Sequence, residues 1–249
     1  MKVLLVDLET APNFCLVWGL FNQNIGINQI VNSGYTLCWS AKWLGKKGVM
    51  FDSVHQSSSL DMITRLHSLL DEADAVIHYN GNKFDIPVMQ REFLLHGLPP
   101  TAPFKQIDLL RVVRKQFKFT SNKLDYVSQM LGLGAKTQHK GMELWTGCMN
   151  GNDKDWKVMK RYNVNDVVLL EKLYYKLLPW IHNHPNVSLY DGATSEACAN
   201  CGSHSLQKRG MAYSKVATYQ RYQCNACGSW MRSRFADKTD RKHLLVREN

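Results

Sequence analysis

Long apolar runs, a secretory leader and internal repeats are all lacking from this sequence. The chain of 249 residues has no run of 18 apolar residues, and its apolar start already meets an acid at Asp7. A membrane-spanning helix needs about 20 apolar residues and a leader needs an unbroken apolar stretch, so neither is predicted. Because 45% of the residues are hydrophobic, wholesale disorder is excluded too. We expect a soluble cytoplasmic protein of bacterial or viral origin with no membrane partner.

Acidic residues are few compared with basic ones. The chain has 21 Asp and Glu against 31 Lys and Arg, for a net charge of +10. Residues 198–249 alone hold 10 basic and 3 acidic residues. An excess of this size favours a polyanionic partner, and nucleic acid is the expected one.

The chain has seven cysteines, an odd number that does not suit a framework of paired disulfides. Four of the seven form two C-x-x-C pairs, Cys198 with Cys201 and Cys224 with Cys227, with 22 residues between the pairs. Each pair is followed by glycine, which lets the backbone turn so that N–H groups point at sulfur. This spacing predicts one structural Zn²⁺ ion held by four thiolates. We expect His204 to be a surface residue and not a ligand.

The hydrophobic pattern predicts an α/β protein. Strands are expected at residues 2–8, 36–44, 48–54, 75–79 and 106–108, and helices at 60–70, 85–96, 109–116, 123–131 and 155–178. These elements make one domain over residues 1–180. A linker follows at 181–197, then a small β-rich zinc-binding segment at 198–235 and a mobile basic tail at 236–249.

Three acidic motifs stand at the ends of predicted elements. Asp7 and Glu9 alternate along the first strand and therefore project from the same face. Asp85 follows a later strand and a turn, where a helix begins. Taken alone, the first pair would be a strand end that reaches solvent, and Asp85 would be a helix N-cap. Carboxylates placed side by side repel one another unless a cation lies between them.

The third motif lies in the long C-terminal helix. Tyr162 and Asp166 are four residues apart and share one face of that helix. An aspartate among valines needs a reason to approach the core, and a metal ion supplies one. An exposed aspartate beside a core tyrosine explains the pair equally well when it is taken alone.

Together, in this order, the D-x-E, F-D and Y-x-x-x-D motifs resemble those of the DEDD superfamily of 3′→5′ exonucleases. The resemblance covers residues 1–178 and is to the tyrosine subgroup, because Arg161 stands where the histidine subgroup has its histidine. It implies a ribonuclease H-like fold, which is a mixed sheet flanked by helices. The zinc-binding segment that follows it in the sequence resembles a zinc ribbon. The resemblance to the exonucleases further implies a catalytic set with two Mg²⁺ or Mn²⁺ ions on four carboxylates, and a tyrosine that orients the attacking water. The implied residues are Asp7, Glu9, Asp85 and Asp166 for the metals, and Tyr162 for the water.

Several other residues are candidates for substrate contacts. Thr10, Asn80 and Phe84 flank the acidic motifs, although turn formation and core packing explain the last two equally well. Asp108 is expected to cap a helix. A basic cluster at helical spacing is either a phosphate track or a solvated face; its members are Arg111, Arg114, Lys115 and Lys118. A stretch rich in aromatics is predicted to pack in the core and not to stack on bases; its members are Trp18, Phe21, Tyr35 and Trp39.

The zinc-binding segment mixes cations with aromatic rings. Lys208, Arg209 and Arg221 alternate with tyrosines, and such a mixture suits a nucleic-acid strand. The alternative is a module that docks on a replication or repair protein.

These features predict a metal-dependent 3′→5′ exonuclease that acts on DNA and prefers single-stranded or frayed ends. One alternative is a ribonuclease or structure-specific endonuclease on the same fold. The other is a non-catalytic nucleic-acid-binding adaptor that has kept the fold. No motif reports a 2′-hydroxyl, so DNA is favoured over RNA only by the resemblance.

Overall fold

Contacts within the chain divide it into two units in the computed structural model, which describes residues 1–237 and 245. The first, called here the sheet unit, spans Lys2–Tyr174. The second, called the cysteine unit, holds Met1 and Tyr175–Asn249. Most of the tail predicted at 236–249 lies outside the described residues. Among the described residues, no helix is long and apolar enough to cross a membrane.

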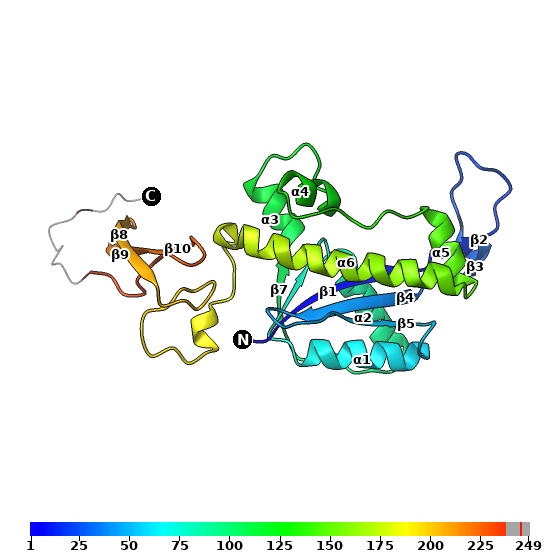
Figure 1. The fold of residues 1–249 in the computed structure, drawn as a ribbon, viewed down its shortest axis with the longest axis horizontal. Helices are drawn as coiled ribbons and strands as arrows, with labels where there is room; N and C mark the ends of the chain where they lie inside the picture. Colours follow the sequence, from blue (N-terminus) through cyan, green and yellow to red (C-terminus); the bar gives the residue numbers. More distant parts are fainter. Residues whose placement is uncertain (238–244, 246–249) are drawn as a thin grey trace. The chain divides into compact units, whose positions relative to one another are not determined.

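A five-stranded mixed sheet is the centre of the sheet unit (Figure 1). The strand order is β5-β4-β1-β6-β7. Strand β1 is antiparallel to β4 and parallel to β6, which in turn is parallel to β7. The strands are β1 (Val3–Thr10), β4 (Thr36–Trp43), β5 (Met50–Ser53), β6 (Ala75–His78) and β7 (Lys105–Asp108). The carboxyl ends of β1, β6 and β7 therefore lie at the same edge of the sheet.

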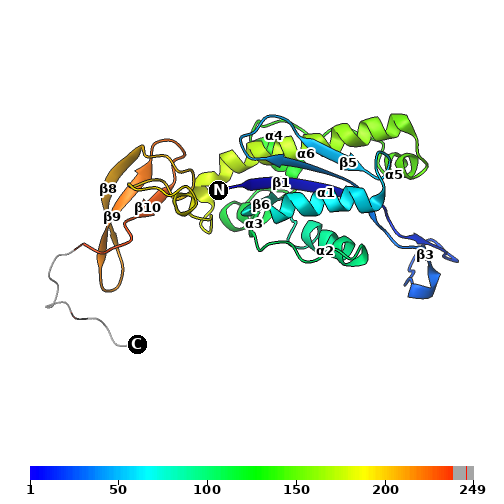
Figure 2. The ribbon, with the colours of Figure 1, turned by 90° about the horizontal axis from the view of Figure 1, so that it is seen from below.

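Helices cover both faces of this sheet (Figures 1 and 2). On one face, Leu4, Val6 and Leu8 of β1 pack with residues from α1 (Ser59–Asp71) and α2 (Asp85–Leu95). The other face packs against α5 (Met142–Met149) and α6 (Asp153–Leu177). Because side chains alternate along β1, Asp7 and Glu9 point to the α6 face. The remaining helices are α3 (Leu109–Gln116) and α4 (Leu124–Met130).

The predicted α/β class is confirmed, and the predicted strands and long helices are all present to within a few residues. The short α5 was not predicted, and neither was a small pair of strands, β2 (Phe14–Cys15) and β3 (Ile30–Asn32). The predicted core role of the early aromatics is wrong for Trp18 and Phe21, which are exposed, and correct for Trp39, which is buried. Tyr35 is also exposed.

The cysteine unit is built on a three-stranded antiparallel sheet in the order β10-β9-β8. Its strands are β8 (Leu206–Tyr213), β9 (Thr218–Cys224) and β10 (Trp230–Arg232). Each C-x-x-C pair sits in a turn at one end of this sheet, and the backbone folds back from Ser203 to Cys198 and from Ser229 to Cys224.

Candidate active site

The predicted acidic residues gather at the carboxyl edge of the parallel strands. Ligand oxygens of Asp7, Glu9 and Asp166 lie within 4.8 Å of one another. Asp7 and Glu9 come from β1, and Asp166 comes from the middle of α6. Residues more than 150 positions apart in the sequence thus form one cluster, called here the acidic cluster.

Asp85 lies near the acidic cluster, but it is not one of the three residues whose ligand oxygens lie within 4.8 Å of one another. It is the first residue of α2 and is buried, and the N-cap position belongs to Phe84, which is half exposed. The negative charge of Asp85 raises the pKa of both Asp7 and Glu9, so the three carboxyl groups are near neighbours. Its role as a simple N-cap is excluded by its place inside the helix.

Burial and mutual repulsion raise the pKa values of these carboxyl groups. Burial, followed by the charge of Asp166, raises the pKa of Glu9 to about 8. Burial raises the pKa of Asp85 to about 7, although hydrogen bonds from its own N–H and that of Leu8 oppose this. The pKa values of Asp7 and Asp166 are raised as well, first by burial. A bound divalent cation would lower every one of these pKa values.

Lys136 supplies the cation that reaches the cluster. Its ammonium group donates to Asp166 Oδ2 at 2.5 Å and to the Tyr162 hydroxyl at 3.2 Å. The loop that carries it is fixed because Asp125 accepts from the Lys136 backbone N–H at 2.7 Å. The other oxygen of the Asp166 carboxylate, Oδ1, is buried and has no partner among the described residues.

Tyr162 stands one helical turn before Asp166, as its spacing predicts. Burial and the neighbouring charges of Glu9 and Asp166 raise the pKa of its phenol, so the hydroxyl keeps its proton at neutral pH. Two rings, those of His139 and Trp145, pack against the Tyr162 ring edge to face. The hydroxyl is therefore fixed beside the acidic cluster.

Sequence reasoning missed two residues of this site. Asn163 is fully buried, and its amide donates to Asp7 Oδ2 at 2.7 Å. A polar residue three positions before Asp166 on a buried helix face was a signal for it. Lys136 lies in a loop without periodicity, and no sequence pattern marked it.

The residues predicted to contact the substrate lie in different elements around the acidic cluster. Thr10 ends β1, where a bulge follows Glu9. Asn80 adopts a positive φ of 71° and donates its N–H to Asp108 Oδ1 at 3.0 Å. Asp108 also caps α3 through the N–H of Leu110, as predicted.

A cavity of about 500 Å³ opens beside the cluster. Asp7 and Asn80 line it together with the cations Arg114, Lys123 and Lys136. Arg114 comes from the predicted basic cluster on α3. One carboxylate of the site and three cations therefore line the same cavity, and cations of this kind can neutralise phosphate groups.

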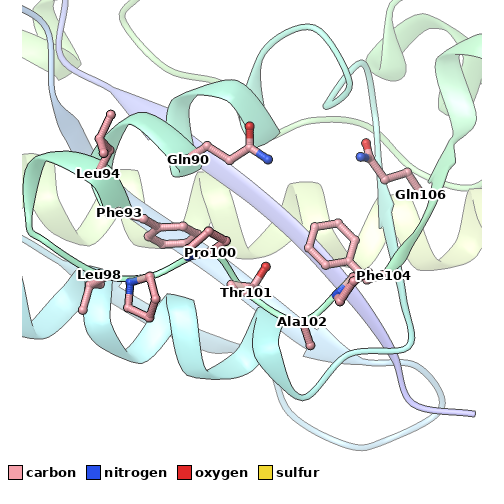
Figure 3. A pocket seen from close by; sticks show the side chains of 11 residues that line it. Gln90, Phe93, Leu94, Leu98, Pro100, Thr101, Ala102, Phe104 and Gln106 are labelled. Atoms are coloured by element: carbon pink, nitrogen blue, oxygen red, sulfur yellow. The ribbon is translucent and has the colours of Figure 1, made fainter.

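A second cavity, of about 430 Å³, lies away from the acids (Figure 3). The C-terminal half of α2 and residues 98–104 line it, with Phe93, Pro100 and Phe104 around the space. It adjoins the start of β7, whereas the acidic cluster lies at the carboxyl edge of the strands. Since none of its lining side chains is titratable, this cavity does not have the chemistry of a hydrolytic site.

The four predicted zinc cysteines also come together. Their sulfur atoms lie within 4.8 Å of one another, and Cys198 to Cys227 and Cys201 to Cys224 measure 3.6 Å each. Burial raises the pKa of Cys224, but hydrogen bonds from the N–H groups of Cys227 and Ala226, with help from neighbouring thiols, bring it down to about 7. Four sulfurs aimed at one centre are compatible with a Zn²⁺ ion.

The exposed side of the cysteine unit carries the predicted cations. Lys208, Arg209 and Arg221 are exposed on β8 and β9. The Arg209 guanidinium lies 5.7 Å from the centre of the Trp230 ring, and that of Arg232 lies 3.8 Å from the Tyr219 ring.

A mixed sheet flanked by helices, with acids at the carboxyl edge of its central strands, defines a ribonuclease H-like fold. Residues 40–178 match the RNase_H superfamily, and the chain belongs to that superfamily. Asp85, Tyr162 and Asp166 lie inside the matched residues, and Asp7 and Glu9 lie before them. The comparison with curated proteins gives no match.

A solved structure is similar as well. It is the family B DNA polymerase from the hyperthermophilic archaeon Pyrobaculum calidifontis, with a TM-score of 0.50 and 17% identity. The similarity covers 72% of this chain and 24% of the polymerase. At this identity the likeness concerns the fold alone, and the chain spans about a quarter of the polymerase's length.

Proposed function

We propose that this protein is a metal-dependent exonuclease that hydrolyses phosphodiester bonds from the 3′ end of DNA. The observation that carries the proposal is the acidic cluster, in which Asp7, Glu9 and Asp166 converge beside the Tyr162 hydroxyl. Membership of the RNase_H superfamily supports hydrolysis of a nucleic acid.

The carboxylates fit a pair of divalent cations. Asp166 Oδ1 is buried and has no partner in the part of the chain that the structure describes, and all four carboxyl groups have raised pKa values, as expected for ligands that await positive charge. Hard oxygen ligands select Mg²⁺ or Mn²⁺. When bound, such ions generate hydroxide from water and stabilise the leaving 3′ oxygen. The holding residues would be Asp7, Glu9, Asp85 and Asp166.

The residues around the metals have separate tasks. Because its phenol stays protonated, Tyr162 orients the attacking water by hydrogen bonding and does not act as a general base. Asn163 holds Asp7 in place through its amide. Arg114 and Lys123, in the adjacent cavity, bind phosphates of the strand.

The 3′→5′ direction and the choice of DNA rest on the resemblance of the three motifs to the tyrosine subgroup of DEDD exonucleases. The fold likeness to a DNA polymerase agrees with DNA as the substrate. Single-stranded or frayed ends are preferred, because a paired strand would have to open for its end to reach acids of which two, Asp85 and Asp166, are buried.

The cysteine unit is proposed to be a zinc ribbon that strengthens substrate binding. Cys198, Cys201, Cys224 and Cys227 hold the Zn²⁺ ion. Phosphates lie on Lys208, Arg209 and Arg221, and bases lie on the neighbouring rings.

The test is digestion of matched single-stranded DNA and RNA oligonucleotides labelled at the 5′ end, with Mg²⁺ or Mn²⁺ and with EDTA. The variant Asp166→Asn keeps the shape of the side chain, and Asp153→Asn is its control on the same helix, where Asp153 is exposed. We expect ladders that shorten from the 3′ end on DNA, and a loss of at least about two orders of magnitude in Asp166→Asn only. Products cut at internal positions, or equal activity of both variants, would contradict the proposal.

A further inference from the structure

Residues 11–35, called here the arm, leave the sheet between β1 and β4 and project beyond α5 (Figures 1 and 2). The arm is an ordered hairpin. The Ala11 N–H donates to the Tyr35 carbonyl at 2.8 Å at its base, and Leu16 N–H donates to the Gln29 carbonyl at 2.9 Å further out. Asn13 also accepts from the Gly34 N–H.

The side chains of the arm are apolar, large and exposed. Trp18 is fully exposed, and Leu20 and Phe21 are 89% and 84% exposed. Other exposed apolar side chains of the arm are Phe14, Leu16, Val17, Ile25, Ile27 and Val31. So many exposed apolar side chains within one hairpin of a folded protein are typical of a binding site.

The arm carries no charge. From Ala11 to Ala41 the sequence has no Asp, Glu, Lys, Arg or His, in a chain whose net charge is +10. A surface without cations offers no ion pair to a phosphate group. Its rings are interleaved with carboxamides, such as Asn22, Gln23 and Asn24. Rings stack on nucleobases and carboxamides bond to base edges, so the arm has the chemistry of a base-binding surface.

The root of the arm adjoins the candidate active site. Ala11 packs in the same hydrophobic cluster as Tyr162, and it follows directly on the strand that carries Asp7 and Glu9. The cations near the site lie elsewhere, in the cavity lined by Arg114 and Lys123. A cavity with cations and the uncharged root of the arm therefore both adjoin the candidate active site.

We propose that the arm binds unpaired nucleobases of the nucleic acid that occupies the active site, with Trp18 and Phe21 as the stacking residues. This inference rests on the proposed nuclease function. It adds that affinity for single strands depends on bases and not only on phosphates.

The test compares binding of a fluorescent oligothymidylate with binding of an abasic oligonucleotide of the same length and charge. The full-length protein is used in EDTA, so that nothing is cleaved. The variants are Trp18→Ala with Phe21→Ala, the conservative Trp18→Phe, and Leu20→Ala as a control that removes an equally exposed apolar side chain without a ring. All three positions are exposed, so melting temperatures should not change.

We expect the wild type to bind the oligothymidylate more tightly than the abasic strand, and the double alanine variant to lose about tenfold in affinity for each stacked base. Binding of the abasic strand should stay as it is, and the slope of log affinity against log salt should not change, because no phosphate contact is lost. Trp18→Phe should restore most of the affinity, and Leu20→Ala should resemble the wild type.

Equal affinities of the wild type and the double variant for oligothymidylate would overturn the inference. So would a wild type that sediments as a dimer while the double variant is monomeric with unchanged DNA affinity, because the arm would then join two copies of the chain. A digestion assay separates these failures from failure of the proposed function. If the protein cleaves DNA but binds it independently of the bases, only the proposal for the arm is refuted. If binding depends on the bases but no cleavage occurs, the proposed nuclease function is refuted.

Discussion

Lys136 places an ammonium group on one oxygen, Oδ2, of the Asp166 carboxylate that a metal ion would use. It is bonded to Asp166 Oδ2, it is only 28% exposed, and its pKa is raised, so it stays charged at neutral pH. Burial lowers the pKa of Lys136, but the charge of Asp166 and the hydrogen bond to its carboxylate outweigh this. A divalent cation that binds Asp166 must therefore displace Lys136 or share the carboxylate with it.

The variant Lys136→Met should bind Mn²⁺ about tenfold more tightly, because a unit charge and a divalent cation about 4 Å apart repel by roughly 8 kcal/mol at an effective dielectric constant near 20, and partial exposure greatly reduces this. Calorimetric titration of the metal-free protein measures the change. Lys136→Arg, which keeps the charge, should match the wild type. Unchanged affinity in Lys136→Met would mean that the ammonium group does not compete with the metal.

The raised carboxyl pKa values predict how pH affects the metal-free protein. The pKa values of Glu9 and Asp85 rise from 4.5 and 3.8 to about 8 and about 7 on folding. The folded chain thus holds protons that the unfolded chain has released, and stability falls as pH rises from about 4 to about 8. In EDTA the melting temperature should be lower at pH 8 than at pH 6. Mg²⁺ should raise it more at pH 8, and an equal effect at both values would contradict this account.

The turn between β6 and α2 sets the position of Asp85. Gly81 donates its N–H to Nδ1 of the buried His78, and a Cβ at this position would lie 2.4 Å from the His78 ring. Burial lowers the pKa of His78, so the ring is neutral and can accept this bond. Contact between Gly81 and the buried His78 therefore fixes the turn from which α2 begins, and with it the position of Asp85.

The variant Gly81→Ala should lose about 1–3 kcal/mol of stability, because the imidazole cannot move out of a packed interior. Nuclease activity should fall with it, since Asp85 begins the displaced helix. Gly19→Ala is the control, because its added Cβ would meet only the flexible end of the Gln23 side chain. Urea unfolding measures both variants, and equal stabilities would refute the argument.

Long periodic elements could be predicted from the sequence, and short or projecting ones could not. The apolar spacing of α1 specifies a face and a length, and the nearly continuous apolar run of β1 indicates a buried strand, so their bounds were nearly correct. Helix α5 has eight residues and follows a glycine at positive φ, which leaves little pattern to detect. Trp18 and Phe21 were assigned to the core because aromatic residues are usually buried, and composition alone does not report that a hairpin projects.

The acidic cluster was predictable as a set because its three motifs, in their order along the chain, resemble those of a known superfamily. Its supporting residues were not, since Lys136 comes from an irregular loop. Only the folded chain brings that loop to Asp166.

At the scale of the whole molecule, the two units should differ in their need for metal. The cysteine unit has few buried side chains, among them Cys198, Tyr222 and Cys224, whereas the sheet unit has two extensive hydrophobic clusters. A small unit of this kind depends on its metal for folding. The variant Cys224→Ser should lose zinc and the unfolding transition of the cysteine unit in calorimetry, with the transition of the sheet unit kept. Cys15→Ser, outside the cysteine cluster, should retain both, and retention of zinc by Cys224→Ser would contradict the assignment.

The distribution of charge predicts how the whole molecule responds to salt. If Lys208, Arg209 and Arg221 each neutralise one phosphate, replacing all three by alanine removes three contacts to a single strand. The slope of log affinity against log salt should then become shallower by about 2, at about 0.7 for each contact. A control variant removes three exposed lysines of the sheet unit, Lys46, Lys47 and Lys157, and so has the same net charge.

Only local contacts distinguish these two variants, because a general effect of net charge would change both slopes equally. Fluorescence anisotropy with a labelled single strand in EDTA measures both across a range of salt concentrations. We expect a shallower slope for the cysteine-unit variant and the wild-type slope for the control. Equal slopes in the two variants would mean that the cysteine unit does not bind the phosphates, and its exposed rings and cations would then need a different partner.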